Sequence, residues 1–130
     1  MPGSRHLMQG KPGRNKGGNF DLDRPLPPSG QSVRETLMAE DHDGMKAAGI
    51  RMGPNARANG EPANAGSQYY VVCSGAVVCD GKEYPRLALF LVDAGEPAPA
   101  FQAGPEGANV LVLQLPRATE RPGSDRKSVV

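Results

Sequence analysis

The chain has little of the chemistry that most catalytic and metal sites use. Its 130 residues include no tryptophan, two histidines (His6 and His42) and two cysteines (Cys73 and Cys79). Two histidines are too few for a three-histidine metal centre. We also expect no Ser–His–Asp triad, because His6 lies in an N-terminal tail and His42 in a predicted turn. No apolar run is long enough for a membrane-spanning helix, and the N-terminus lacks the apolar stretch of a secretory signal. We therefore expect a cytoplasmic protein without membrane contacts, whose thiols stay reduced.

The net charge of +1 hides an uneven distribution of charge along the chain. Residues 1–20 carry four bases and no acid, and residues 117–130 carry four bases and two acids. Residues 21–116 carry seven bases and twelve acids, a net charge of −5. The Gly, Pro and Lys/Arg content of the basic ends is typical of solvated, disordered segments. Aromatic residues are few and are not interleaved with the bases, so we expect no nucleic-acid partner.

Glycine and proline divide the chain into short apolar segments. The 17 Gly and 13 Pro residues bound segments at a spacing typical of a sandwich or jelly roll. We expect an extended or disordered N-terminal arm (1–31), one β-barrel (32–116) and a flexible C-terminal tail (117–130). The expected strands are residues 33–38, 45–52, 68–79, 87–92, 99–103 and 108–115, with a loop over 53–66. A short helix at 33–38 is the alternative to the first strand.

Two of these strand predictions carry further detail. Residues 68–79 are expected to form a hairpin that turns at Ser74–Gly75, with a second turn at residues 104–107. The hairpin places Cys73 and Cys79 opposite other residues, which argues against a disulfide. The strand at 108–115 has Val110, Val112 and Gln114 on one face and Leu111, Leu113 and Leu115 on the other. Because both faces are mostly apolar, we expect the strand to be buried on both sides.

Two segments resemble the signature motifs of the cupin superfamily, whose members are small β-barrels. Residues 68–75 read Gln-Tyr-Tyr-Val-Val-Cys-Ser-Gly, and residues 93–103 read Asp-Ala-Gly-Glu-Pro-Ala-Pro-Ala-Phe-Gln-Ala. The resemblance covers about residues 33–116 and implies an all-β fold, the cupin-like double-stranded β-helix (jelly-roll barrel). In the family, these motifs carry three His and one Glu that hold a metal.

The metal-binding positions of the motifs carry other residues in this chain. Gln68 stands at the Glu position, Ala98 at the His position of the second motif, and Gln102 at its Asn position. Counting back from Gly75, the side chains with oxygen donors near the paired His positions are Glu61 and Asn64; counting forward from Gly53, they are Asn59 and Glu61. First-row metals in such sites need imidazole nitrogens and a carboxylate, and Ala98 has no donor atom. We therefore expect no metal and no other cofactor.

The resemblance and strand alternation together predict what lines the barrel. Gln68 and Tyr70 should point inward, as should Ala98 and Gln102. One interpretation is a closed polar network of Gln68, Tyr70 and Gln102. The other is a pocket in which Gln68, Tyr70, Asn64 and Gln102 bind a polar small molecule.

Two functions remain open at this point. The first is a metal-free cupin-like module that binds a small molecule or has a structural role, and that forms a homodimer or larger assembly. The apolar residues of the arm, Phe20, Leu22 and residues 25–28, would mediate that assembly. The second is a metal-independent isomerase, cyclase or lyase that uses Tyr70, Glu61 and Gln68 to position and protonate its substrate. The sequence does not decide whether the chain is an enzyme.

Overall fold

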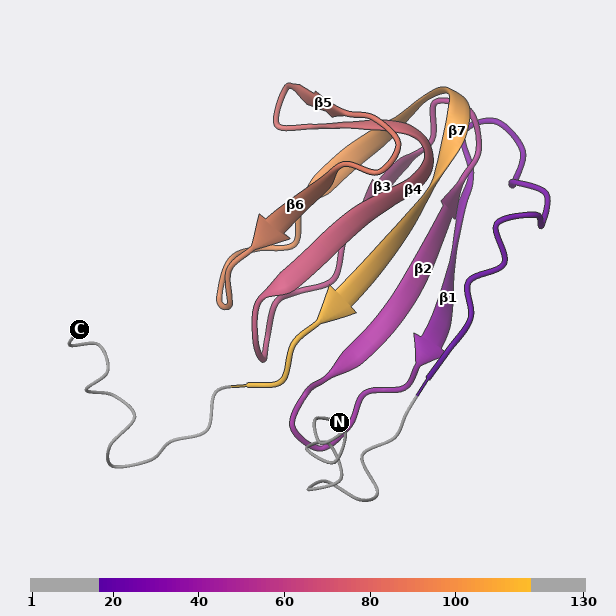
Figure 1. Cartoon of the computed structure of the whole chain (residues 1–130). Helices are drawn as coiled ribbons and strands as arrows, with labels where there is room; N and C mark the ends of the chain where they lie inside the picture. The colour runs from indigo at the N-terminus through magenta and orange to yellow at the C-terminus, as the bar shows by residue number, and fades with distance from the viewer. Residues whose placement is uncertain (1–16, 118–130) are drawn as a thin grey trace, which may run out of the picture.

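The computed structural model describes residues 17–117 and is all-β (Figure 1). These residues include no helix that could cross a membrane. Seven strands form one antiparallel, strongly bent sheet: β1 (Ser32–Met38), β2 (Lys46–Met52), β3 (Arg57–Asn59), β4 (Gln68–Cys79), β5 (Lys82–Tyr84), β6 (Leu89–Val92) and β7 (Ala100–Gln114).

The two longest strands, β4 and β7, pair along most of their length and connect the two halves of the jelly roll. In the first half, residues 108–114 of β7 also pair with β2, and residues 68–71 of β4 also pair with β6. This half therefore has the order β1-β2-β7-β4-β6. In the second half, β7 pairs with β3 and β4 pairs with β5, which gives the order β3-β7-β4-β5. Figure 1 shows β7 curving over from one half to the other.

Two facing glycines allow this change of direction. Gly75 in β4 and Gly107 in β7 both have positive φ, 73° and 78°, and the β4–β7 register shifts on either side of Gly75. A Cβ atom on Gly75 would overlap the carbonyl oxygen of Gly107. The predicted hairpin at Ser74–Gly75 and the predicted turn at 104–107 are therefore wrong, because these residues bend continuous strands. The predicted placement of the cysteines across that hairpin is wrong too, although both are free thiols as expected.

The other strand predictions agree better with the structure. Residues 33–38 and 45–52 form the β1–β2 hairpin, so the helix alternative is wrong. The strand predicted at 87–92 begins two residues later, as β6. The predicted loop contains a strand that the sequence pattern does not indicate, β3, which pairs with residues 100–102 of β7.

The core lies on the inner face of the bent sheet. Its buried residues come from β2, β4 and β7 and from the segment before β3: Ile50, Met52, Ala56, Tyr70, Val72, Val77, Cys79, Phe101, Ala103, Ala108, Val110 and Val112. Gln114 shares the inner face with Val110 and Val112, as predicted. The opposite face of β7 is not fully covered, since Leu113 is 37% exposed. The expectation that this strand is buried on both faces is therefore wrong.

Residues 17–31 of the predicted arm pack on the outer side of β1 and β2. Phe20 lies on Gly49, where a Cβ atom would collide with its ring. The Arg51 guanidinium lies 4.6 Å from the centre of the Phe20 ring and donates a hydrogen bond to the Asp21 carbonyl (2.7 Å). The predictions for residues 1–16 and 118–130 concern segments outside the described residues.

Both ends of the described chain lie beside the β1–β2 turn. Gly18 packs against the backbone of Leu37, near the end of β1. The backbone N–H of Arg117 donates to the Asp43 carbonyl (2.8 Å), and its guanidinium donates to the His42 carbonyl (3.0 Å). The chain therefore enters and leaves the barrel at the same end.

Substitution of Gly75 tests the account of the bend. Gly75→Ala should lower the free energy of unfolding by about 3 kcal/mol, because alanine disfavours positive φ and its Cβ would also strike the Gly107 carbonyl. Gly81→Ala is the matched control, since Gly81 has a φ of 76° and a Cβ atom added there would meet nothing within 4 Å. The control should cost about 1 kcal/mol in urea unfolding. Equal losses in the two variants would contradict the account.

Candidate functional site

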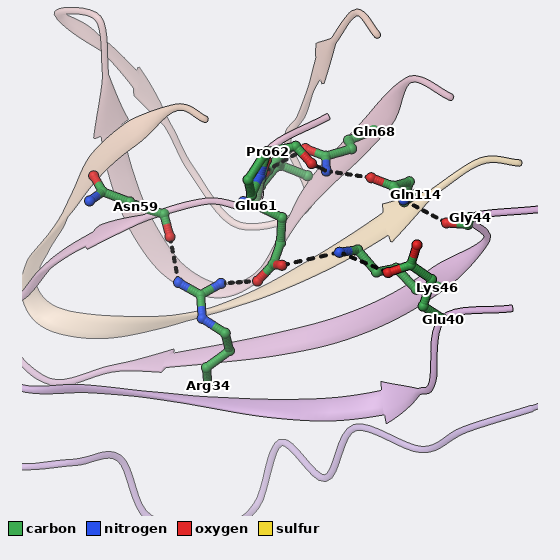
Figure 2. Close-up of polar contacts among 10 residues, drawn as sticks. Arg34, Glu40, Gly44, Lys46, Asn59, Glu61, Pro62, Gln68 and Gln114 are labelled. Atoms are coloured by element: carbon green, nitrogen blue, oxygen red, sulfur yellow. Dashed lines mark hydrogen bonds and ion pairs between the residues drawn. The ribbon is translucent and has the colours of Figure 1, made fainter. Parts of the chain in front are cut away.

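The site implied by the cupin resemblance is a closed hydrogen-bond network (Figure 2). Gln68 begins β4, points into the barrel and has no exposed surface. Its amide nitrogen donates to the Pro62 carbonyl (3.1 Å) and to the side-chain oxygen of Gln114 (2.9 Å). Its oxygen accepts a hydrogen bond from the Tyr70 hydroxyl (2.8 Å). The Gln114 amide in turn donates to the Gly44 carbonyl (2.5 Å), so both amides are satisfied by protein groups.

Tyr70 is held on all sides within the core. Its hydroxyl accepts from the backbone N–H of Glu61 (2.9 Å), and its ring stacks on Phe90 with the ring centres 5.0 Å apart. Phe101 meets the same ring edge-on at 6.0 Å. Burial raises the pKa of Tyr70 to about 12, although the hydrogen bond from Glu61 acts in the opposite direction. A general acid must reach its substrate, and the fully buried Tyr70 does not.

Glu61 lies between two cations at the rim of the barrel, as Figure 2 shows. Its carboxylate pairs with the Arg34 guanidinium and with the Lys46 ammonium, the latter at 3.3 Å. Arg34 also donates to the Asn59 carbonyl (2.6 Å), and Lys46 lies 3.9 Å from a carboxylate oxygen of Glu40. Both oxygens of Glu61 are therefore occupied by ion pairs and are not free to bind a substrate or a metal ion.

The two cations of this cluster are functional-site residues that the sequence analysis missed. Arg34 pairs with the core residue Ile50, and Lys46 lies an even number of residues before it on β2. Strand alternation therefore places both side chains on the inner face. Applying the same alternation to the predicted β1–β2 hairpin would have identified them.

Three predicted pocket residues do not reach the barrel interior. Asn64 is exposed, and Ala98 lies in the irregular segment between β6 and β7. Gln102 pairs with the exposed Val78, and its amide donates to the Asn55 carbonyl (3.2 Å). The predicted inward orientation is wrong because regular alternation begins only at the start of β7. Phe101 therefore faces inward, and Gln114 occupies the place in the network that was assigned to Gln102.

The donor set does not fit a first-row metal ion. Within residues 17–117, no three His, Cys, Asp or Glu side chains converge in a way that could hold one. His42, the one histidine in this range, has an 84% exposed side chain in the β1–β2 turn. Gln68 turns its amide hydrogens toward two acceptors, and Ala98 has no donor atom.

The two thiols lack the features of reactive cysteines. Burial raises the pKa of both Cys73 and Cys79, and the Asp80 carboxylate raises the pKa of Cys79 further. Reactive cysteines sit in positive surroundings that favour the thiolate, and these two do not.

Two cavities open on the surface, away from the Gln68 network. One of about 280 Å³ lies between the arm and β1–β2, and its lining combines prolines with charged groups: Arg24, Pro25, Pro27, Pro28, Gln31, Val33, Glu35 and Arg51. The other, of about 590 Å³, follows the β6–β7 connection and includes Asp80, Asp93 and Glu96. Neither is lined by Gln68, Tyr70 or Glu61, so neither gives access to the predicted catalytic residues.

Comparison with known proteins identifies the fold. No protein-family model and no curated protein sequence matches the chain. Among solved structures, the cupin domain of an XRE-family transcriptional regulator from Enterobacter cloacae is 21% identical, with a TM-score of 0.53, over 66% of this chain and 98% of that one. An RmlC-like cupin protein from Desulfovibrio desulfuricans is 18% identical, with a TM-score of 0.55, over 73% and 92%.

A cupin superfamily protein from Desulfitobacterium hafniense is also similar, at 17% identity and a TM-score of 0.53, over 78% of this chain and 98% of that one. At these identities the likeness concerns the fold alone. The chain has the cupin jelly-roll fold that its two motifs imply.

Replacing Gln68 by the Glu of the family motif tests the closed network. Gln68→Glu should destabilise the protein by about 3 kcal/mol at pH 7, because a buried carboxylate would face two acceptors, Pro62 and Gln114. Burial raises the folded-state pKa of the new Glu above its unfolded value. The loss of unfolding free energy relative to wild type should therefore become smaller as the pH falls toward 4. Gln102→Glu, on the outer face, loses the hydrogen bond to the Asn55 carbonyl and should cost no more than about 1 kcal/mol. An undiminished stability of Q68E at pH 7 would refute the network.

Removal of the Tyr70 hydroxyl tests its role by a second route. Tyr70→Phe leaves the Glu61 N–H and the Gln68 oxygen unpaired and should cost about 2 kcal/mol in urea unfolding at pH 8. Because the folded-state pKa is raised, the stabilising effect is complete below the unfolded pKa of about 10 and is lost as the pH rises through 12. The difference in the free energy of unfolding between wild type and Y70F should therefore become smaller between pH 10 and pH 12. A gap that widens there, or a similar loss in the exposed-site control Tyr69→Phe, would contradict this role.

Proposed function

We propose that this chain is a metal-free cupin-like module that acts by binding or assembly, not by metal catalysis. The observation that carries the proposal is the Gln68–Gln114–Tyr70 network, in which protein groups satisfy the side chains that would otherwise face a metal or substrate. Glutamine can both donate and accept hydrogen bonds, so other protein groups can satisfy Gln68 and Gln114 without a metal or a ligand. The hydrogen-bonded amides of Gln68 and Gln114 support the view that the centre of the barrel stabilises the fold and does not bind a ligand.

Binding would then use the outer surface of the barrel. The cavity beside the arm combines an apolar wall, including Pro25 and Pro27, with the guanidinium groups of Arg24 and Arg51. Both guanidinium groups pair with the Glu35 carboxylate of the same lining, at 3.6 and 3.0 Å, so the cavity suits a polar small molecule better than an anion that needs two free guanidinium groups. The cupin domain from Enterobacter cloacae belongs to a transcriptional regulator, which agrees with a barrel that serves within an assembly.

The alternative is a metal-independent isomerase, cyclase or lyase. It requires Tyr70 and Glu61 to reach a substrate, whereas Tyr70 has no exposed surface and both oxygens of Glu61 are ion-paired. The described residues of the network also lack a free base beside Tyr70. The binding or assembly role is therefore the better supported of the two.

Metal analysis of the full-length protein tests the proposal. Protein purified without a metal-affinity step should contain fewer than about 0.1 equivalents of iron, manganese, nickel or zinc. Each ion at about 100 times a micromolar Kd would raise the melting temperature by several degrees if it bound, and we expect a shift below about 1 °C. Glu61→Gln should respond in the same way as wild type. Near-stoichiometric metal, with a melting temperature that falls in EDTA, would overturn the proposal.

A further inference from the structure

One face of the barrel exposes large apolar side chains in adjoining rows. On the outer face of β6, Leu89 and Leu91 are 56% and 50% exposed. Strand pairing places Tyr69 beside Leu91 and beside Leu113 of β7. In the next row, Val71 lies between Leu89 and Leu111. We call this surface the leucine face; its members are Tyr69, Val71, Leu87, Leu89, Leu91, Leu111, Leu113 and Leu115. Figure 1 shows the three strands that carry it side by side.

The face is large enough to form an interface. From the exposed fractions of its members, it offers roughly 600 Å² of apolar surface, against about 800 Å² per partner in a standard-size interface. Two such faces would bury roughly 1,200 Å², the lower end of the range for specific complexes. A patch of this size is at the upper end of the largest apolar patches on monomeric proteins, which are often functional.

Leu87 adds a second observation at the beginning of β6. It has a φ of 71°, a conformation that disfavours a leucine, and its side chain is 67% exposed. Hydrogen bonds from Leu87 N–H to the Val72 carbonyl (2.7 Å) and from Ala88 N–H to the Pro85 carbonyl (2.9 Å) hold it there. A polar residue or glycine would suit this solvated turn better, so the position favours an apolar contact with another molecule.

A second copy of this chain is the occupant that fits the face. A two-fold interface requires a surface complementary to itself, and the outer positions of β4, β6 and β7 in this patch carry no charge that would repel its copy. The neighbouring outer surface, on β2, is already covered by Phe20 of the same chain. The leucine face is the part of this sheet that the described arm leaves open.

Charge complementarity sets the orientation. The exposed Arg86 precedes β6 and the exposed Asp93 follows it, at opposite ends of the strand. If the two-fold axis runs across the strands, β6 packs over the partner's β6 in the reverse direction. Each Arg86 then lies near an Asp93 of the other copy. Rim charges of this kind fix the register of an interface more than they add affinity.

We propose that two copies pair through the leucine face, with their β6 strands antiparallel. The proposal rests on the binding and assembly role above and names the partner. It differs from assembly through the N-terminal arm, because residues 20–31 pack on the barrel of their own chain.

Sedimentation velocity of the full-length chain from about 1 to 200 µM, in EDTA, tests the proposal. We expect a dimer that the double variant L89S/L91S weakens at least about 30-fold, since each substitution occurs twice in the interface. Both leucines are half exposed, so the melting temperature of the variant should stay close to that of wild type. Val78→Ser is the matched control, since Val78 is 44% exposed on β4 but lies in the other half of the sheet, and it should leave the dimer unchanged.

The charged rim provides a test of orientation. Arg86→Glu should weaken the dimer about five-fold at low salt, and the charge-swapped R86E/D93R should restore it. A monomer at every concentration would overturn the proposal, as would a dimer indifferent to L89S/L91S. Phosphatidylcholine vesicles that bind wild-type monomer but not L89S/L91S would also overturn it and assign the face to lipid. A dimer that takes up stoichiometric metal would refute the metal-free role alone.

Discussion

The pairing of β4 with β7 is the constraint on which the rest of the structure depends. These strands carry both halves of the jelly roll, and their register places Gln68 directly opposite Gln114. A slip of β4 by one residue along β7 would turn Gln68 away from the interior, bring Tyr69 into it and leave Gln114 without its partner. The backbone ladder, the bend at Gly75 and Gly107, and the polar network are therefore fixed by the same alignment.

In the metal-free role proposed above, the network would take the place of a central ion. Metal-dependent domains draw part of their folding free energy from the bound ion, and their stability varies with its concentration. An amide pair supplies donors and acceptors in equal number and needs no counter-charge. At the rim of the barrel, the charges of Arg34, Lys46 and Glu61 likewise neutralise one another through ion pairs.

Much of the fold could be predicted from the sequence, because strand alternation and turn residues are local properties. The inner position of Gln114 and the β1–β2 hairpin follow from periodicity alone. The turns predicted at Gly75 and Gly107 are bends in continuous strands, because sequence alone does not distinguish a turn from a bend when two glycines face each other across a ladder. Which residues at the start of β7 face the interior could not be predicted either, because the segment before β7 is irregular and does not carry the alternation forward.

The candidate site was predictable only in part. Gln68 and Tyr70 emerged from the motif resemblance, and their mutual hydrogen bond was one of two interpretations. Gln102 was chosen where Gln114 belongs, since the choice between them depends on long-range register. The exposure of Leu89 and Leu91 likewise depends on which face the neighbouring strands cover, which a single strand's sequence does not reveal.

The sequence on either side of the barrel is basic, whereas the barrel itself is acidic. Gly18 and Arg117 both lie beside the β1–β2 turn, so the basic segments 1–20 and 117–130 attach at the same end of the barrel. These segments carry eight bases and two acids, whereas residues 21–116 have a net charge of −5. Such a separation of charge orients a protein in the field of an approaching acidic partner and accelerates encounter at low ionic strength. A chain that is almost neutral overall therefore combines an acidic barrel with basic sequence that continues from Gly18 and from Arg117.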